Sequence, residues 1–433
     1  MSNGSLLSRL GPVLRPDSAR VIIRPFRPAV EPRDLTPTDK TRANHIVDRV
    51  VALLPEEAAQ QLADVLANFD QRHRNLVGLF EARADEMEDA FADHAEFTKA
   101  QRQLIGAFFL HEYSFEASAL FNPSIVLHPD QAECWTGSCR FILSLRAVGE
   151  GHISSLTFRA GTIGSDGAVA IDDKSKLAAI PRIRSRVPGQ LGDDVTVGFD
   201  AASDISERVI FPVTDAQSNG IEDARFVRLD DDGRIRYLAT YTAYNGRAIR
   251  SELIETPDFV DFRLTPLRGY AARNKGMALF PRKIAGKYAM IARQDNENLH
   301  LLYSSDLYFW EGGTPILRPR HFWEFVQIGN CGSPVELDEG WLLLTHGVGA
   351  IRKYTIGAVL LDKTDPSIVL ARSREPLIRP EPFEREGYVP NVVYTCGLIK
   401  HGADLVIPYA VSDTFTNFAT IPILQLLKTL EPV

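Results

Sequence analysis

The sequence predicts a mainly β fold, a β-propeller, preceded by an N-terminal α-helical extension. Three observations support this class. The 433 residues are 45% hydrophobic and 24% charged, an ordinary globular composition with enough apolar residues for a large core. Before about residue 115 the apolar residues recur with a helical period, and from Phe121 onward they alternate with a period of two. We therefore expect a helical extension over residues 1–115 and a β domain over residues 116–433.

The helical part divides into three expected segments. Ile46, Val47, Val50 and Val51 recur at helical spacing, and they predict a helix that starts near residues 36–39 and ends at Pro55. Pro55 suits the first turn of the next helix, which we expect over residues 55–91. A third helix is predicted over residues 96–113, so that this part forms a hairpin or small bundle.

The β part is predicted from short runs of β-branched and aromatic residues, separated by turn residues such as Asp231-Asp232-Gly233. No long helical period interrupts the series, which argues against a parallel βαβ sheet. Similar strands begin near residues 141, 237, 288, 341 and 404. Roughly 300 residues shared among five units leave about 60 each, enough for a four-stranded propeller blade. The sequence thus favours a five-bladed β-propeller, with a β-sandwich as the alternative.

Composition and charge exclude several classes of function. The net charge of −8 argues against a nucleic-acid partner. No run of 18 apolar residues predicts a membrane-spanning helix, and the first residues do not resemble a secretory signal. The few scattered cysteines fit a reducing compartment, so we expect a cytoplasmic protein. These cysteines are Cys134, Cys139, Cys331 and Cys396.

Polar residues gather at the ends of several expected strands, where propeller loops converge on a ligand. Glu222, Asp223 and Arg225 offer a general acid held by a cation, although a surface turn with an ion pair has the same pattern. Arg273, Asn274 and Lys275 offer donors for an anion, and a solvated basic turn is the plainer interpretation.

Three further polar groups follow the same logic. Arg293 opens a loop of six polar residues that carries Asp295 and Glu297, which an ordinary hairpin also explains. His346 ends an apolar strand and is followed by Arg352 and Lys353. Asp413 ends another strand, where it binds sugar hydroxyls or caps a turn. No tight cluster of metal ligands is present, so we expect no metal.

The ordered motifs resemble glycoside hydrolase family 130, the β-mannoside phosphorylases and related β-mannosidases. The resemblance covers about residues 115–425. It rests on FNPSIV at residues 121–126, GIEDARF, NKGMALFP, a Ser-x-Asp-Leu-x-x-Trp stretch ending at Trp310, GWLLLTHGV, GAVLLD, YVPNVVYTCG and AVSDT.

The resemblance implies a five-bladed propeller whose central pocket cleaves a β-mannosidic bond with inversion. Asp223 matches the general acid, whose proton passes through a sugar hydroxyl. The other implied site residues are, for the substrate, Asn122, Arg225, Asn274, Tyr244 and Asp413 and, for phosphate, Arg273, Lys275, Arg293 and His346.

Two departures from the phosphorylase pattern concern the phosphate site. Ala292-Arg293-Gln294 replaces a common His-Arg-Pro, and Gln327 stands where a Lys is common. Phosphorolysis needs one acid and a cluster of cations, with inorganic phosphate as co-substrate and no other cofactor. Inverting hydrolysis needs a second carboxylate about 6.5–9.5 Å from the first. The candidates for it are Asp295, Glu297 and Glu336.

The sequence therefore predicts an enzyme that cleaves β-linked manno-oligosaccharides with inversion, and it favours phosphorolysis to mannose 1-phosphate. An inverting β-mannosidase and a non-catalytic sugar-binding propeller are the alternatives. The amphipathic helices of the extension predict a homo-oligomer contact or a cover over the pocket mouth.

Overall fold

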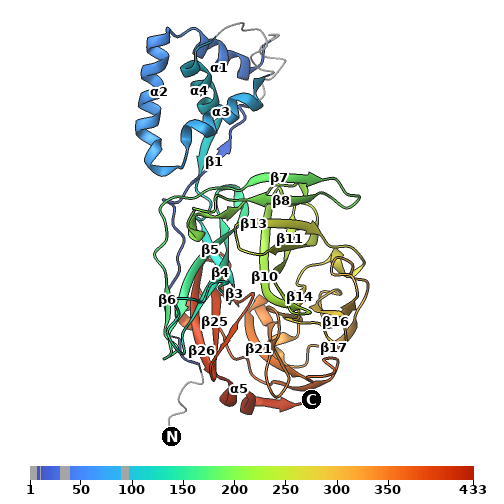
Figure 1. Cartoon of the computed structure of the whole chain (residues 1–433). Helices are drawn as coiled ribbons and strands as arrows, with labels where there is room; N and C mark the ends of the chain where they lie inside the picture. The colour runs from blue at the N-terminus through green and yellow to red at the C-terminus, as the bar shows by residue number, and fades with distance from the viewer. Residues whose placement is uncertain (1–6, 10, 30–39, 89–96) are drawn as a thin grey trace. The chain divides into compact units, whose positions relative to one another are not determined.

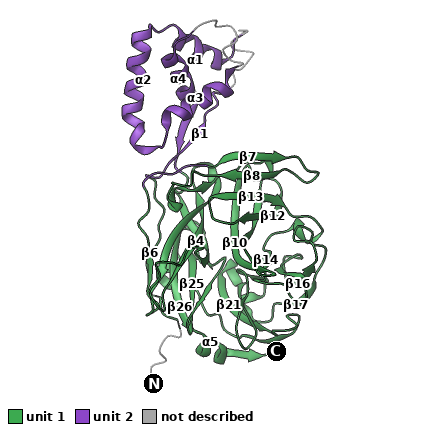
Figure 2. Ribbon diagram, in the orientation of Figure 1, with its two compact units in different colours: residues 1–18, 115–175, 181–433 green, residues 19–114, 176–180 purple. Residues whose placement is uncertain are grey.

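The computed structural model describes residues 7–9, 11–29, 40–88 and 97–433. The chain forms two compact units (Figure 2). A helical unit comprises residues 19–114 and 176–180, and a β unit comprises residues 1–18, 115–175 and 181–433. The expected boundary near residue 115 thus lies between the two units, whereas the first 18 residues belong to the β unit. Among the described residues, no helix is long and apolar enough to cross a membrane.

The helical unit contains four α-helices and one two-stranded antiparallel sheet among its described residues (Figure 1). The helices are α1 (Arg42–Val51), α2 (Pro55–Phe69), α3 (Leu76–Glu86) and α4 (Lys99–Phe108), and the sheet pairs β1 (Ile22–Pro25) with β2 (Leu110–Tyr113). Val47, Leu62, Phe80 and Leu104 meet in its core, which is the amphipathic arrangement that the helical period predicts.

The prediction of a single helix over residues 55–91 is wrong. The chain leaves α2 through a short 3-10 turn, and Asn75 adopts a left-handed φ of 52° before α3 starts. The intervening stretch Asp-Gln-Arg-His-Arg-Asn has no apolar residue to bury, so a continuous helix gains no packing there. The start expected at residues 36–39 lies outside the described residues, and Thr41 caps the first described turn of α1.

The β unit consists of four hydrogen-bonded sheets among its described residues. The first sheet joins two antiparallel runs. One run is β3 (Ala119–Leu127), β4 (Cys139–Val148) and β5 (Ser154–Ile163), with β6 (Val169–Ile171) and β9 (Val209–Ile210) on β5. The other is β10 (Gly220–Asp231), β11 (Arg234–Tyr244), β12 (Ile249–Thr256) and β13 (Asp261–Pro266), continued by β8 (Asp194–Gly198) and β7 (Arg182–Val187).

The other three sheets follow in chain order. The second is β14 (Ala278–Leu279), β15 (Tyr288–Ala292), β16 (Leu299–Ser304) and β17 (Thr314–Leu317). The third is β18 (Gln327–Asn330), β19 (Val335–Glu336), β20 (Trp341–Val348), β21 (Tyr354–Leu361), β22 (Val369–Ser373) and β27 (Leu430–Pro432). The fourth is β23 (Val393–Tyr394), β24 (Ile399–His401), β25 (Asp404–Val411) and β26 (Phe415–Pro422), after which α5 (Ile423–Thr429) leads into β27.

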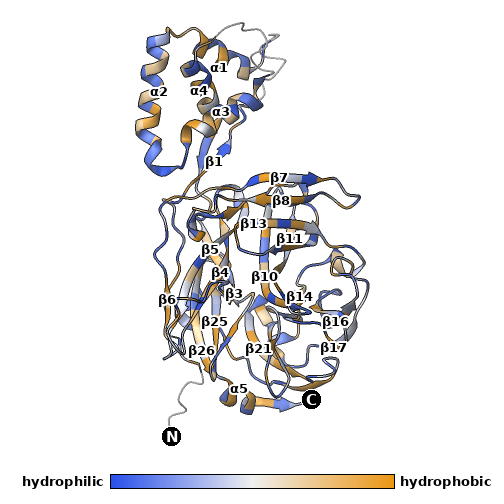
Figure 3. Cartoon of the chain, in the orientation of Figure 1, coloured by the Kyte–Doolittle hydropathy of each residue, from blue (hydrophilic) through white to orange (hydrophobic). Residues whose placement is uncertain are grey.

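The strands expected near residues 141, 237, 288, 341 and 404 are β4, β11, β15, β20 and β25, which begin at residues 139, 234, 288, 341 and 404. Each lies inside an antiparallel run and contains consecutive buried residues. Figure 3 shows hydrophobic and hydrophilic residues mixed along the strands of the β unit. A strand that is buried on both faces has a nearly continuous apolar sequence, because neighbouring sheets cover both of its faces.

The two runs of the first sheet meet at one parallel pair, Gly220 with Ser154. Gly220 has a φ of 147°, and a Cβ at this position would collide with the Ser154 side chain. Glycine therefore permits the close approach that brings the start of β10 beside β5.

The first and last runs of the β unit are also in contact. β3 packs against β25 and β26, and the Leu120 amide donates to the Thr414 carbonyl at 2.9 Å. Residues Ser8 and Leu14 form β-bridges with Thr420 and Thr416 of β26. The N-terminal stretch thereby adds to the last sheet, a long-range pairing that local sequence patterns do not encode.

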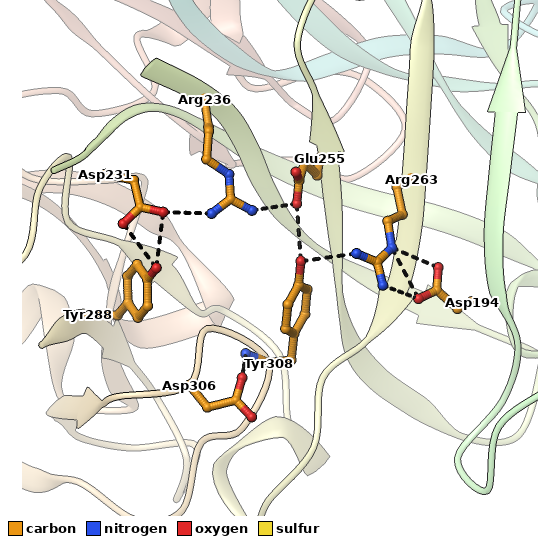
Figure 4. A network of polar contacts seen from close by, with 8 residues as sticks. All are labelled: Asp194, Asp231, Arg236, Glu255, Arg263, Tyr288, Asp306 and Tyr308. Carbon is orange, nitrogen blue, oxygen red and sulfur yellow. Dashed lines mark hydrogen bonds and ion pairs between the residues drawn. The ribbon is translucent and has the colours of Figure 1, made fainter. Parts of the chain in front are cut away.

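A polar network ties the first sheet to the second (Figure 4). Arg236 on β11 donates to Asp231 at 2.8 Å and to Glu255 at 2.6 Å. The hydroxyl of Tyr288 on β15 donates to Asp231, and the hydroxyl of Tyr308 donates to Glu255 at 3.1 Å. These side chains are half-buried, and Asp231 also pairs with Lys283 at 2.9 Å, so the charges of the network have more than one partner each.

Candidate active site

A polar cavity of about 210 Å³ in the β unit draws its lining from all four sheets. Its residues come from β3, β4, β10, β18, β20, β21 and β23 and from the loops beside them. They are Asn122, Arg146, Glu222, Asp223, Arg225, Lys275, Gly276, Arg293, Gly329, Asn330, His346, Arg352, Tyr354, Val392, Tyr394 and Asp413. This convergence of distant segments makes the cavity the candidate active site.

Irregular backbone directs two of the key side chains into this cavity. The β10–β11 register shifts between Glu222 and Arg225, and Asp223 has a φ of 53°. The β3–β4 register shifts between Phe121 and Ser124, and Asn122 has a φ of 47°. Bulges re-aim side chains, and left-handed non-glycine residues persist where the surroundings enforce them.

Asp223 accepts hydrogen bonds from two neighbours inside the cavity. The Asn122 amide donates to its Oδ1 at 2.6 Å, and Arg146 Nη1 lies 3.3 Å from the same oxygen. Burial raises the pKa of Asp223, but the charges of Arg146, Arg225 and Lys275 together outweigh burial, and the net pKa lies below its usual value. Asp223 is therefore a carboxylate at neutral pH.

Arg225 is a buried support for this region. Its guanidinium donates to the carbonyls of Cys331 and Asp223 at 2.8 and 2.9 Å and to the Tyr394 hydroxyl at 2.7 Å. All three bonds are to neutral groups, so its charge remains available to stabilise an anion in the cavity.

The cavity lining also combines a buried arginine with a neutral histidine. Arg293 Nη1 lies 3.2 Å from His346 Nε2, and both side chains are largely buried. Burial lowers the pKa of His346 well below its usual value, and the charges of Arg293 and Arg225 lower it further. His346 is thus uncharged at neutral pH, and its Nε2 accepts from Arg293.

Polar atoms without a partner concentrate on this lining. Arg293 Nε and both side-chain polar atoms of Asn330 are buried and make no hydrogen bond among the described residues. Buried polar groups are normally satisfied. Their grouping here indicates a wall built to receive a polar ligand.

The charges of the lining favour an anion. Among the described lining residues, five are cationic and three are carboxylates, so with His346 neutral the formal excess is two positive charges. Arg146 pairs with Glu222 at 2.8 Å, and Lys275 lies 3.8 Å from Glu222. A small dianion would balance the excess.

Asp413 completes the cavity beside Asp223. Ser412 and Asp413 have φ values of 46° and 48°, in the turn between β25 and β26. Burial and the neighbouring Asp223 carboxylate raise the pKa of Asp413 to about 6, against the lowering effects of Arg146 and Arg352. This carboxyl therefore changes its charge in the range of pH in which enzymes work.

The raised pKa of Asp413 predicts a pH-dependent gain in stability for Asp413→Asn. A raised carboxyl pKa favours folding while the group is protonated, and that contribution is lost as pH rises through about 6. The variant should therefore gain about 1–2 kcal/mol over the wild type between pH 4.5 and pH 8. Thermal unfolding of both proteins at the two pH values measures it, and a gain that does not change with pH would contradict it.

The structure brings together seven of the residues predicted from the sequence. Those that line the cavity are Asn122, Asp223, Arg225, Lys275, Arg293, His346 and Asp413. Three others do not line it. Asn274 donates to the carbonyls of Arg293 and Gln294, Arg273 lies over the exposed ring of Tyr270, and Tyr244 pairs with Gly220 at the start of β10. Asn274 thus holds the loop that carries Arg293.

The three carboxylates considered for water activation also lie outside the cavity lining. Asp295 accepts from the amides of Glu297 and Asn298 in its own loop. Glu336 forms an ion pair with Arg282 at 2.7 Å. The carboxylates that accompany Asp223 in the cavity are Glu222 and Asp413 instead.

Sequence reasoning missed Arg146, which sits in the apolar run of β4. A lone arginine among buried strand residues is a signal, because such a charge needs a partner. Arg352, Tyr354 and Tyr394 also line the cavity. The rings of Tyr354 and Tyr394 pack against His346, with centroids 5.8 and 5.0 Å away.

Known proteins are similar to this chain in sequence and in fold. The chain is 35% identical over 215 residues to a 1,2-beta-oligomannan phosphorylase of Thermoanaerobacter sp. (strain X514), covering 48% of this chain and 70% of that protein. It is 31% identical over 234 residues to a beta-1,2-mannobiose phosphorylase of Listeria innocua serovar 6a, covering 51% and 63%.

The solved structure of a Listeria innocua beta-1,2-mannobiose phosphorylase in complex with beta-1,2-mannobiose superposes with a TM-score of 0.52. The match has 22% identity and covers 72% of this chain and 92% of that one, and it concerns the fold. A family model described as beta-1,4-mannooligosaccharide phosphorylase matches residues 195–432, more than half of the sequence. The chain therefore belongs to glycoside hydrolase family 130.

Proposed function

We propose that this protein is a β-mannoside phosphorylase that cleaves manno-oligosaccharides with inversion and releases α-mannose 1-phosphate. The observation that carries the proposal is the composition of one cavity. This cavity is lined by the Asp223 carboxyl and by a buried Arg293–His346 pair, it contains buried polar atoms without a hydrogen-bond partner among the described residues, and its lining has a formal excess of two positive charges. The matched relatives are named as phosphorylases of oligomannan and mannobiose.

The proposed architecture is a five-bladed propeller. Its blades are the two runs of the first sheet and the three remaining sheets, and the cavity is the central pocket. The contact between β3 and the β25–β26 pair supports closure of the ring. Short antiparallel blades around a pocket protect their strand edges, which favours this arrangement over a sandwich.

In the proposed reaction, a phosphate oxygen attacks C1 of the mannosyl group from the face opposite the glycosidic oxygen. The C1–O bond breaks, and the leaving oxygen takes a proton that originates on Asp223 and passes through a sugar hydroxyl. Arg146 and Asn122 then stabilise the Asp223 carboxylate that remains. No metal or organic cofactor is part of this proposal.

The lowered pKa of Asp223 is compatible with an acid role. Phosphate bound near Arg293 and Arg225 would add negative charge to the cavity and offset the cations that hold Asp223 ionised. Phosphate binding would thus raise the pKa of Asp223 and favour its protonated form. The nucleophile therefore helps to protonate the acid whose proton the leaving oxygen takes.

The same Arg293–His346 pair supports phosphate over water as the nucleophile. Gln327, which replaces the expected lysine, lies 3.4 Å from His346 Nε2 and offers a neutral donor there. The missing charge is compensated by Lys275 and Arg352 in the cavity lining.

The test is to incubate the enzyme with β-1,2- and β-1,4-mannobiose, with and without phosphate, and to identify the products by NMR. We expect α-mannose 1-phosphate and mannose, and no cleavage without phosphate. Equal release of free mannose in both buffers would make the enzyme a hydrolase, with Glu222 or Asp413 as the second carboxylate. Binding of mannobiose without cleavage would make it a sugar-binding propeller. An oligomer contact through the helical unit and a cytoplasmic location stay predictions.

A further inference from the structure

Two hairpins of equal length rise from cavity-lining strands. β4 and β5 close at the Val148–Ser154 pair, and β20 and β21 close at the Val348–Tyr354 pair. The first carries Arg146 and the second His346, each two residues before its closing valine, and both line the cavity. The two turns therefore project from equivalent points at the same end of their strands.

Both turns hold non-glycine residues in left-handed conformations. His152 has a φ of 60° in the first turn, and Ile351 and Arg352 have φ values of 56° and 53° in the second. The side chain of Arg352 lines the cavity. His152 stands six residues after Arg146, just as Arg352 stands six residues after His346. This correspondence places His152 at the rim of the cavity.

A loop from residue 388 to residue 392 joins these turns along the rim. The Tyr388 amide donates to Thr414 Oγ1 at 2.8 Å, directly after Asp413. The Tyr354 amide donates to the Asn391 carbonyl at 3.1 Å, and Val392 itself lines the cavity. The loop therefore starts beside Asp413 and ends beside Tyr354.

Tyr388 is an exposed aromatic ring in a fixed place on this loop. Its hydroxyl lies 2.6 Å from His152 Nδ1, and the two rings are 5.6 Å apart. The residue is nevertheless 48% exposed. An exposed ring held by its hydroxyl offers its face to a ligand, and the apolar face of a pyranose suits such a surface.

The size of the cavity indicates what that ligand is. Its volume of about 210 Å³ lies below the roughly 300–1,000 Å³ of sites that enclose a drug-sized ligand. A mannosyl group and phosphate would occupy this space, so the rest of an oligosaccharide would lie at the mouth.

We propose that Tyr388, oriented by His152, forms the subsite for the leaving sugar of a β-linked manno-oligosaccharide. This inference rests on the proposed function and adds a residue that selects the acceptor. Tyr388 is a binding residue in it, and His152 is a positioning residue.

The experiment measures synthesis from mannose 1-phosphate and a mannose or mannobiose acceptor. Tyr388→Ala should raise the acceptor KM about tenfold, the upper range for one lost stacking contact, with the KM for mannose 1-phosphate unchanged. Tyr388→Phe keeps the ring but loses the bond to His152, and we expect a rise of about threefold. His152→Ala should resemble Tyr388→Phe.

Trp135→Ala is the matched control. Trp135 is 85% exposed in the loop between β3 and β4, at the end of these strands opposite to the β4–β5 turn. Its removal should change neither KM. Equal melting temperatures of all variants would show that the fold is intact.

Four results would overturn the inference. An unchanged acceptor KM in Tyr388→Ala, with an active wild type, would reject the subsite alone. A parallel rise in both KM values would reject a role specific to the leaving sugar. If the wild type is inactive, calorimetric titration with β-mannotriose decides: absence of wild-type binding rejects the proposed function and the subsite together, and equal binding by wild type and Tyr388→Ala rejects the subsite.

Discussion

Asp223→Asn should lower kcat for phosphorolysis of β-mannobiose by about 10³-fold, within the range of 10²–10⁴ for a lost general acid. Asparagine has nearly the same shape and still bonds to Asn122 and Arg146 through its amide, but it delivers no proton. The KM for the mannoside should change little, because the cavity keeps its form. The rate of mannose 1-phosphate release measures the effect.

Glu222→Gln is the matched control for this prediction. Glu222 is the adjacent residue on β10, it also lines the cavity, and it pairs with Arg146 at 2.8 Å. Its neutral form should weaken that pair and cost about tenfold or less in kcat, as expected for the loss of one partner of a charged hydrogen bond. If both variants lose activity equally, or if Asp223→Asn keeps a tenth of it, Asp223 is not the proton donor.

Arg293→Met should lower kcat/KM for phosphate by about 10²–10³-fold, the loss seen when one preorganised donor to a developing anion is removed. Arg293 is buried, bonds to neutral His346 and has no carboxylate within ion-pair distance among the described residues. Burial even lowers the pKa of Arg293, which indicates a cation that the fold leaves without an anionic partner. A bound phosphate would supply that anion. Loss of the Arg293 charge should therefore weaken mainly the binding of phosphate.

Rates at varied phosphate and saturating mannobiose test this prediction. Arg293→Lys keeps the charge but loses the planar fork, so its loss should fall between wild type and Arg293→Met. Arg236→Met is the control, because Arg236 belongs to the network between the first two sheets and is absent from the cavity lining (Figure 4). This control should lower the melting temperature without changing the KM for phosphate. An unchanged KM for phosphate in Arg293→Met would remove Arg293 from the phosphate site.

The strands of the β unit follow from the sequence. β4, β11, β15, β20 and β25 begin within three residues of the positions predicted from their apolar runs. Helices of the extension follow from their amphipathic period, except that α2 and α3 are separate. The period of apolar residues is a local property, and the prediction of a continuous helix fails where six polar residues, the last of them the left-handed Asn75, interrupt that period.

Part of the site was also visible in the sequence. Asp223, Arg293, His346 and Asp413 stand where apolar strands end, and propeller loops converge at such points. Arg273, Asn274 and Tyr244 have the same local pattern but do not reach the cavity lining. Their neighbours in sequence do not distinguish them, because a residue's direction on a loop depends on its backbone angles.

The sequence by itself determined the fold class, the order of the strands and the polar groups at their ends, because burial imposes a period that local residues record. Only the tertiary structure decided that Arg146 pairs with Glu222 and Asp223, and that Ser8 and Leu14 pair with β26. It also decided that Tyr388 meets His152 across 236 positions. Such contacts depend on bulges, left-handed residues and the packing of distant sheets, which no local period specifies.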